Sequence, residues 1–349
     1  MAFPSAGGYG NLPNGVFSPV IYSKQVQLAF RKSSVIEAIT NNDYFGEIAN
    51  FGDSVRIIKE PEITVTAYNR GTAVNAQDLI DTDYTLVVDQ ANYFAFKVDD
   101  IEAAHSHVNW MSLSTDRAGY RLRDTYDNDV LKYMSGYTTA NAVRTTFPGT
   151  KADSAAGSDE LLAANKLFRE SFGNLTSAST LGSIPLAPRL PGATAISSST
   201  VSPMMLIARM ARRLDQQNVD SNGRWLVVDP IFVEMLKDED SRLLNADFGG
   251  SGLQNGLVLN NVHGFKLFVS NNLPSVGTGA GTAGSAEQAT DFGVIVAGHE
   301  SSVATAEQIT KTESYRDVDS FADIVRGMHL YGRKILRPEA LVTARYNVA

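Results

Sequence analysis

Three glycines in the last third of the chain satisfy a pattern that can bind a dinucleotide. Gly279, Gly281 and Gly284 reproduce the pattern GxGxxG. A dinucleotide site needs this pattern between a strand and the start of a helix, so that the pyrophosphate meets the helix N-terminus. Here the glycines follow Leu273-Pro274 within a run of Gly, Ala, Thr and Ser, which favours a loop. No phosphate-binding Gly-Lys-Ser/Thr sequence occurs in the chain.

One pair of histidines could bind a metal ion. His105 and His107 lie close to Asp99, Asp100 and Glu102. Two histidines two positions apart could share a metal with a carboxylate if they lay on a strand. The sequence signals no third ligand, and the whole chain has 5 His, which leaves few candidates. A solvated or hydrogen-bonded pair is therefore favoured over a metal site.

The remaining candidates for catalysis are two carboxylate pairs and one serine. Asp81/Asp83 and Asp127/Asp129 could perform acid–base chemistry. A turn for the first pair and a solvated helix face for the second explain them without it. The serine of Gly250-Ser251-Gly252 lacks the glycine two positions later that a nucleophile elbow requires. We therefore predict no catalytic site, no cofactor and no metal.

Composition limits the class of protein. The 349 residues are 43% hydrophobic and 19% charged, as in a globular protein of about two domains. No apolar run approaches the ~18 residues of a membrane span, and the N-terminus does not resemble a secretory signal. The absence of cysteine excludes disulfides and thiol chemistry, and fits assembly in a reducing cytoplasm. The net charge of −8 argues against a dedicated nucleic-acid binder, but not against a surface that lies beside DNA.

The first part of the chain reads as extended pieces with little core of their own. Residues 1–34 could be a frayed terminus or an arm that orders only against neighbouring subunits. An apolar cluster favours the arm; it comprises Val16, Phe17, Val20, Ile21 and Tyr22. A short helix over Ser33–Ala49 could follow, with Ser33 or Ser34 as its N-cap.

Two pairs of alternating segments then predict a long β-hairpin, or ribbon. The outgoing side comprises Ser54–Lys59 and Ile63–Tyr68, separated by Pro61, which marks an edge or a bend. The returning side comprises Tyr84–Asp89 and Tyr93–Val98, which also alternate. A two-stranded ribbon is marginally stable in water, so it must lie on its own domain or on a neighbouring subunit.

Ser114–Met134 is the clearest predicted helix. Its apolar stripe has three- and four-residue spacing and comprises Leu122, Tyr126, Val130, Tyr133 and Met134. Ser114 or Thr115 could cap it, and Gly136 could end it. Arg123 and Asp127 are expected on the opposite, polar face as an i,i+4 pair.

The middle of the chain separates an irregular connection from a compact α/β unit. Thr138–Thr200 is rich in Ala, Ser, Thr, Gly and Pro, with one amphipathic helix expected over Asp159–Phe172. In Val201–Asp291, Ser202-Pro203 begins one helix and Asp229-Pro230 begins a second. Between them, Trp225–Val228 predicts a buried strand. A hairpin is expected from Gly256–Leu259 and Phe265–Val269, with Asn260–Gly264 as its turn.

The C-terminal stretch Gly293–Ala349 predicts a strand at Val294–Ala297, an exposed polar excursion, and a return strand over Ile324–Ile335. The return strand must pair with something earlier in the chain.

Several phrases of this stretch resemble the major capsid proteins of tailed bacteriophages. They are Gly298-His299, the excursion with Glu313, Tyr315 and Arg316, then Arg326-Gly327, Tyr331-Gly332 and Leu336-Arg337-Pro338-Glu339-Ala340. The Asp-Pro helix start, Gly264-Phe265 and Ser270-Asn271-Asn272-Leu273-Pro274 resemble the axial domain of the same family. The resemblance covers about 200–349 well, and 33–137 more loosely through the order of ribbon and long helix.

The resemblance implies an α+β subunit with the tailed-phage major capsid fold, which encapsulins and herpesvirus floors share. Its parts would be an N-terminal arm (1–34), an extended loop and peripheral domain with the spine helix (35–137), an irregular connection (138–200), an α/β axial domain (201–300) and the return strands of the peripheral domain (301–349). Copies would form the hexamers and pentamers of an icosahedral shell around double-stranded DNA, in the virion, after assembly in the bacterial cytoplasm. No long charged helical segment precedes residue 35, so a separate scaffolding protein is expected, together with a portal and possible decoration proteins.

The sequence also offers candidates for subunit contacts. They are Val16, Phe17, Ile21, Tyr22, Arg70, Asp81, Asp83, Arg123, Asp127, Arg316, Arg333 and Arg337. The basic bias of the last region could reflect ion pairs or a weak, sequence-independent lining beside DNA; its residues are Arg326, Arg333, Lys334, Arg337 and Arg345. Two other functions stay open, an encapsulin-like shell that holds a protein cargo and, remotely, a nucleotide-binding α/β enzyme.

Overall fold

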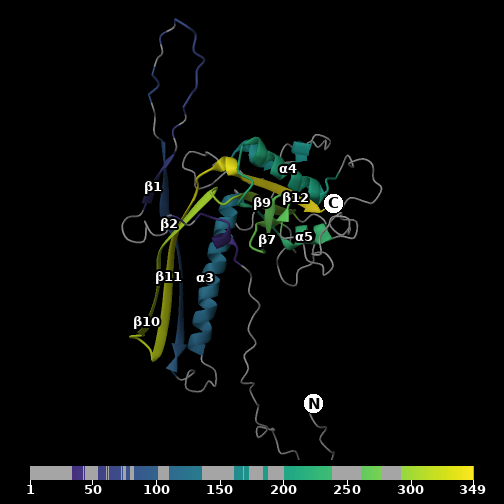
Figure 1. Ribbon diagram of the computed structural model, residues 1–349. Helices are drawn as coiled ribbons and strands as arrows, with labels where there is room; N and C mark the ends of the chain where they lie inside the picture. Colours follow the sequence, from purple (N-terminus) through teal and green to yellow (C-terminus); the bar gives the residue numbers. More distant parts are fainter. Residues whose placement is uncertain are drawn as a thin grey trace, which may run out of the picture.

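The computed structural model describes residues 34–41, 43, 54–59, 61, 63–71, 73, 76–78, 82–100, 110–135, 161–167, 169–172, 184–187, 200–237, 261–276 and 292–348. Within these residues the chain forms two β-sheets, and one long helix runs along the first sheet and reaches the second (Figure 1).

The first sheet is antiparallel and has four strands. Their order is β1 (Ser54–Lys59), β2 (Thr82–Asp99), β11 (Ala322–Ile335) and β10 (Val303–Arg316). The predicted return strand therefore pairs with an earlier segment, β2, as expected. The polar segment before it is not an exposed excursion but strand β10, which pairs with β11 along its length. A sheet with one solvated face accepts such polar residues, so the expectation of an excursion was wrong.

The predicted ribbon is confirmed at its base and wrong at its tip. β1 pairs with β2 from Ser54↔Val87 to Lys59↔Thr82, and β2 is one continuous strand rather than two segments. Ile63–Tyr68 is not a strand: none of the described strands pairs with it, and it is exposed at every position. Alternation alone does not make a strand where no neighbour supplies the hydrogen bonds. Figure 1 shows this tip reaching well beyond the body of the molecule.

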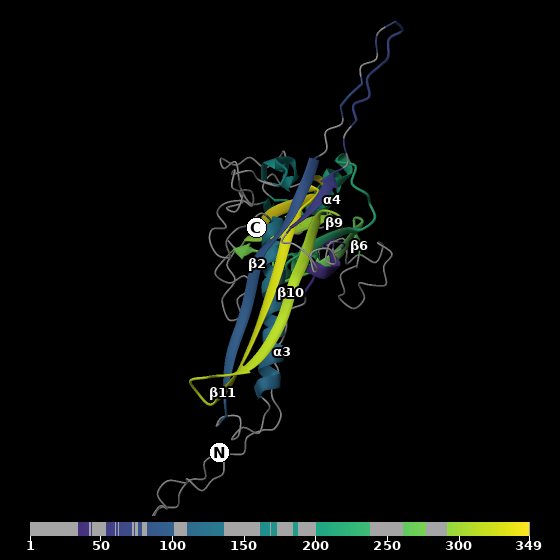
Figure 2. The same cartoon turned by 90° about the vertical axis from the view of Figure 1, so that its left-hand side faces the viewer.

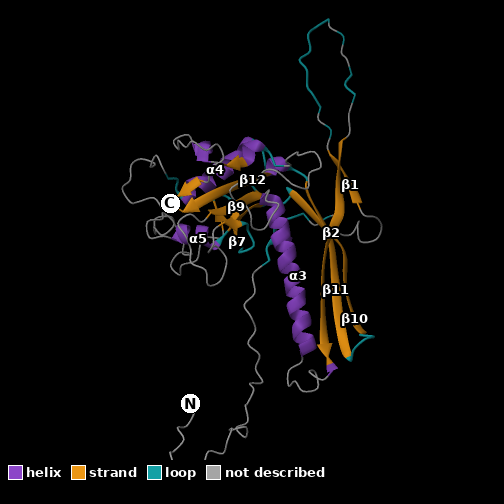
Figure 3. Ribbon diagram, turned by 180° about the vertical axis from the view of Figure 1, so that it is seen from behind, coloured by secondary structure: helices purple, strands orange, loops and turns teal. Residues whose placement is uncertain are grey.

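The long helix is α3 (Trp110–Ser135), which lies along the sheet (Figures 2 and 3). It begins before Ser114 and Thr115, so neither residue is its N-cap. The predicted stripe is buried towards its C-terminal end, where Tyr126, Val130 and Met134 are inaccessible or nearly so. The Tyr126 ring packs edge-on against Tyr331 of β11, with centroids 4.8 Å apart. Aromatic and aliphatic burial thus fixes the helix on the sheet.

Within the described residues of Ser33–Ala49, which are 34–41 and 43, the expected helix is a single 3-10 turn, η1 (Ile36–Ala38). The backbone leaves the helical conformation at Ile39. Asn41 then makes a parallel bridge to Ala304 at the start of β10, with its N–H donating to the Val303 carbonyl over 2.9 Å. Pairing with the sheet outweighs the local helical signal here.

The second sheet has eight strands. The path runs β3 (Lys166–Leu167), β12 (Leu341–Val348), β9 (Phe292–His299), β5 (Arg224–Val228), β7 (Phe265–Val269) and β6 (Asn261–Val262); β4 (Ile184–Leu186) also pairs with β12, and β8 (Ser275–Val276) with β9. Helices α4 (Pro203–Gln216) and α5 (Pro230–Lys237) pack on one face, and α3 with η1 packs on the other. The predicted strand at Val294–Ala297 is the buried centre of β9.

Local signals at the starts of α4 and α5 are confirmed. The Ser202 hydroxyl accepts a hydrogen bond from the Met205 N–H over 3.3 Å, with Pro203 at the first helical position. The Asp229 carboxylate likewise accepts from the Phe232 N–H over 3.2 Å. Capping depends on neighbours within a few residues, so the sequence reveals it directly.

The second hairpin turn is tighter than predicted. His263 and Gly264 form the whole turn, both with positive φ (49° and 84°), and Asn261 and Val262, assigned to the loop, belong to strand β6. Two successive positive φ values are typical of the two-residue turn that matches strand twist. Gly256–Leu259 lies outside the described residues.

Two expectations about chain division were wrong. The segment 159–172 forms no α-helix in its described part, but 3-10 turns η2 (Ala163–Asn165) and η3 (Arg169–Phe172) around strand β3. β12 was expected among the return strands of residues 301–349 but lies in the second sheet, between β3 and β9. A short 3-10 turn, η6 (Pro338–Ala340), carries the chain from one sheet to the other.

Candidate assembly surfaces and the helix between them

Asp127 on α3 accepts four hydrogen bonds in the described structure. It is fully buried, and its Oδ1 accepts from the Ser34 hydroxyl at 3.0 Å and from the N–H groups of Val35 and Ile36 at 3.0 and 3.1 Å. Its Oδ2 accepts from the Asn272 amide at 2.9 Å. Asp127 therefore joins residues 34–36, the long helix and the second sheet.

This position corrects the prediction for Asp127. The residue was expected on the solvated face of the helix, paired with Arg123. Instead, Arg123 pairs with Glu37 of η1 over 3.0 Å. Both contacts bring the beginning of the described chain onto α3.

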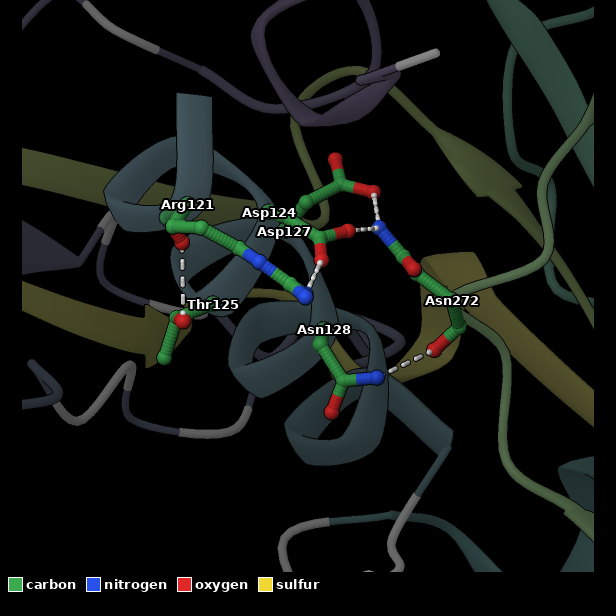
Figure 4. Close-up of polar contacts among 6 residues, drawn as sticks. All are labelled: Arg121, Asp124, Thr125, Asp127, Asn128 and Asn272. Atoms are coloured by element: carbon green, nitrogen blue, oxygen red, sulfur yellow. Dashed lines mark hydrogen bonds and ion pairs between the residues drawn. The ribbon is translucent and has the colours of Figure 1, made fainter. Parts of the chain in front are cut away.

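Asn272 is held on α3 from two sides (Figure 4). Its side-chain amide donates to Asp124 Oδ1 at 3.0 Å as well as to Asp127. Its backbone carbonyl accepts a hydrogen bond from the Asn128 side-chain amide at 3.3 Å. Asp124 is also 3.6 Å from the Arg121 guanidinium. Asn272 follows β7, so these bonds attach the second sheet to the middle of the helix.

Asp129, two residues after Asp127, attaches α3 to the first sheet. Its Oδ2 accepts from the Tyr331 hydroxyl at 2.8 Å and pairs with Arg333, whose guanidinium lies 4.8 Å from the centre of the Tyr133 ring. Burial, reinforced by the charge of Asp129, raises the pKa of Tyr331, so its hydroxyl keeps the proton that it donates. The pair Asp127/Asp129 thus serves two interfaces within the subunit.

The glycines of the motifs Arg326-Gly327 and Gly298-His299 lie where an aromatic ring of the neighbouring strand comes close to the backbone. A Cβ at Gly327 would lie 2.4 Å from Cε1 of Phe94 on β2, and one at Gly298 would lie 2.8 Å from Cζ2 of Trp225 on β5. At each position an aromatic ring of the neighbouring strand occupies the space that a side chain would need. Packing therefore accounts for glycine at these two positions.

Large apolar side chains are exposed at both ends of the first sheet. At the ribbon these are Ile58, Ile63, Val65 and Tyr68, with Val65 93% exposed. At the β10–β11 turn, Val318 is 95% exposed and Phe321 is 79% exposed. Figure 1 places the two groups at opposite ends of the molecule. Clustered exposed apolar groups are candidates for contact with other molecules.

The other predicted contact residues are not gathered at one place. Arg56 pairs with Asp83 at 3.3 Å, and Arg316 pairs with Asp100 and lies 3.6 Å from Asp323. Arg70 and Arg337 are exposed at separate positions. Val16, Phe17, Ile21, Tyr22 and Asp81 lie outside the described residues. Contact of any of these with a neighbouring subunit stays a prediction.

Sequence reasoning missed the exposed apolar residues of the ribbon and the turn as contact candidates. The sequence did hold a signal for them: apolar residues stand beside turn-forming residues, in segments with no predicted element that could bury them.

The basic residues of the C-terminal region are partly accounted for within the chain: Arg326 pairs with Glu313 at 2.8 Å, Arg333 pairs with Asp129, and Arg345 is buried.

Most of the candidate metal-binding and nucleotide-binding residues are not among the described residues. His105, His107 and the loop Gly279–Gly284 fall outside the described residues. Within the described part, no group of three His, Cys, Asp or Glu side chains could hold a metal ion. None of the described helices is long and apolar enough to cross a membrane.

The fold is that of tailed-phage capsid subunits, as solved structures show. A protein of Mycobacterium phage Che8 superposes with a TM-score of 0.67 at 24% identity, over 95% of this chain and 98% of that one. The capsid of cyanophage P-SCSP1u gives 0.62 at 18% identity, over 95% and 94%. The capsid of an empty GTA particle gives 0.60 at 12% identity, over 99% and 100%.

The family itself follows from the sequence match. Residues 60–344 match the family model described as phage capsid protein, and the chain belongs to this family. It is a structural subunit of a phage capsid shell, present in many copies in the virion. Comparison with curated proteins gives no match.

Proposed function

We propose that copies of this chain form the hexamers and pentamers of an icosahedral shell around double-stranded DNA, and that the ribbon makes the principal contact between neighbours. The main support for this proposal is the exposure of the ribbon tip. Every described residue of 63–71 is exposed, including Ile63, Val65 and Tyr68, and the tip extends beyond the body of the subunit (Figure 1). Apolar side chains in this position gain burial only against another molecule.

Repetition of such a contact accounts for a closed assembly. A ribbon that leaves one subunit and lies on a different surface of the next makes a head-to-tail contact, and such contacts close into rings when the rotation permits. On this proposal assembly takes place in the host cytoplasm with a separate scaffolding protein and a portal, and the chain carries no catalytic role. Contact with DNA is weak and independent of sequence.

The test replaces the ribbon's apolar residues while leaving its backbone. The triple variant Ile63→Ser/Val65→Ser/Tyr68→Ser should melt like the natural chain, because these side chains touch little within the subunit. It should form no particles by negative-stain microscopy, whether expressed alone or with a scaffolding protein. The matched control, Thr64→Ser/Thr66→Ser, changes the same segment and should assemble normally. Particles of normal size and yield from the triple variant would overturn the proposal.

The contents of the particles test the second half of the proposal. DNA protected from nuclease inside complete virions is expected. Particles free of nucleic acid and filled with a protein cargo would instead identify an encapsulin-like shell.

A further inference from the structure

We infer that Asp127 couples residues 34–36, at the end of the N-terminal arm, to the second sheet, so that a displacement of one loosens the other. This rests on the proposed assembly role and on the expectation that residues 1–34 form an arm that contacts neighbouring subunits. The inference concerns how that contact reaches the rest of the subunit.

One carboxylate holds both partners. Oδ1 accepts three hydrogen bonds from the consecutive residues Ser34, Val35 and Ile36, and Oδ2 accepts one from Asn272. Because residue 34 is the last residue of the expected arm, these three bonds fix where the arm joins the long helix. The partner on Oδ2 belongs to the segment after β7, in the second sheet.

The site has little tolerance for the loss of one partner. Asp127 is fully buried, and its donors in the described structure are a hydroxyl, two backbone amides and a carboxamide, with no cationic side chain among them. A buried carboxylate needs all its donors, since each missing one leaves an unsolvated charge. The carboxyl group is also planar and rigid, so rotation that improves the bonds of one oxygen disturbs those of the other. Groups that share such a network respond non-additively.

Asp124 provides the contrast. It accepts from the same Asn272 amide at 3.0 Å but makes no described contact with residues 34–36. If Asn272 merely fastened the second sheet to α3, the loss of either acceptor would have similar consequences. If Asp127 couples the two partners, only changes that act through Asp127 should loosen residues 34–36.

The experiment measures hydrogen exchange in the full-length, unassembled subunit. Asn272→Ala removes the described bond to Asp127 Oδ2 and none of the described bonds of residues 34–36. In this variant the amides of Val35 and Ile36 should exchange about tenfold faster, the effect of a coupling within one network. In Asp124→Ala the same amides should exchange within about twofold of the natural rate, because Asn272 keeps its bond to Asp127 and Asp127 keeps its bonds to residues 34–36. The amides of Leu226 and Val227, in the core of the second sheet, serve as the reference for global unfolding.

Two results would overturn the inference: unchanged exchange at Val35 and Ile36 in Asn272→Ala, or equal acceleration in Asp124→Ala. Acceleration matched by the reference amides would also count against it, since it would indicate general destabilisation. The measurement needs no assembled shell. Its outcome is therefore separate from that of the ribbon variant, which tests the proposed function.

Discussion

At Gly327 the backbone of β11 passes under the Phe94 ring of the adjacent strand, and the space that a side chain would need is already filled. A Cβ there would meet Cε1 at 2.4 Å and Cζ at 2.7 Å. Gly119, on the exposed side of α3, is the opposite case, since a Cβ there meets no atom within 4 Å. The two glycines separate the effects of packing and backbone entropy.

Gly327→Ala should therefore lower the free energy of unfolding by about 1–3 kcal/mol, the range for overpacking. Gly119→Ala should raise it by about 0.5–1 kcal/mol, because alanine is the better helix former. Urea unfolding of both variants checks the pair. Recovery of Gly327→Ala by Phe94→Leu would identify the ring as the cause, whereas a neutral Gly327→Ala would contradict the packing argument.

Asp229 is a second residue whose burial has a measurable effect. It caps α5 and accepts a hydrogen bond from the Tyr346 hydroxyl of β12. Burial raises the pKa of its carboxyl to about 6, although the bonds from Tyr346 and the Phe232 amide lower it. The native state thus holds a proton between about pH 4 and 6 that the unfolded chain, with an ordinary pKa, releases.

The resulting pH dependence has a definite sign. This carboxyl's contribution to stability is complete below its unfolded pKa and is lost as the pH rises through about 6. Asp229→Asn should flatten that part of the profile in thermal melts from pH 4 to 7. Tyr346→Phe, which removes a bond that lowers the pKa, should shift the loss to higher pH. An unchanged profile in Asp229→Asn would contradict the assignment.

At the scale of elements, α3 is the piece to which the others attach. Its Asp127 holds residues 34–36 and Asn272, and its Asp129 holds Tyr331 of β11. The Tyr331 hydroxyl also accepts from the Asn92 amide of β2 at 3.3 Å, so one hydroxyl connects the helix with two strands. The helix is thus fastened by buried polar bonds as well as by its apolar stripe.

Tyr331→Phe should cost about 1–2 kcal/mol, since it removes the hydroxyl from Asp129 while keeping the ring against Tyr126. Tyr315→Phe, on the exposed part of β10, should change stability by less than about 0.5 kcal/mol. Thermal melts of the two variants provide the comparison. Equal, small effects would mean that ring packing alone fixes the helix.

At the scale of the whole molecule, the described chain has a buried core under each sheet and exposed apolar groups at both ends of the first. The subunit can therefore fold through its two sheets and still have surface to bury. Ser34, the last residue of the expected arm, belongs to the folded part through its bond to Asp127, so the arm is better bounded at residues 1–33.

Deletion of residues 1–33 should leave the melting temperature of the subunit almost unchanged, because the contacts of Ser34, Val35 and Ile36 remain. Shell closure should fail, as judged by negative-stain microscopy of particles formed with a scaffolding protein. Closed particles of normal size from the truncated chain would refute an assembly role for the arm.

The elements that the sequence predicts correctly are those that depend on local signals. The starts of α4 and α5, the strands β5 and β9 and the base of the ribbon rest on neighbours within a few residues or on alternation, and they are confirmed. Strand β10 is polar and strand β12 carries Arg345 and Asn347, so neither has the pattern of a buried strand. Their sheets accept them because other chain segments supply the hydrogen bonds.

The class of this protein, a phage capsid subunit, could be inferred from the sequence, because the family's short motifs and the helix caps can be recognised without knowing which strands pair. Three features became known from the fold: Asp127 is buried, β12 lies in the second sheet, and the described part of 159–172 forms a strand and 3-10 turns rather than an α-helix. The reason is that burial and strand pairing depend on residues far away in the chain. Asp127 and Asn272 are 145 positions apart, a separation that no local periodicity records.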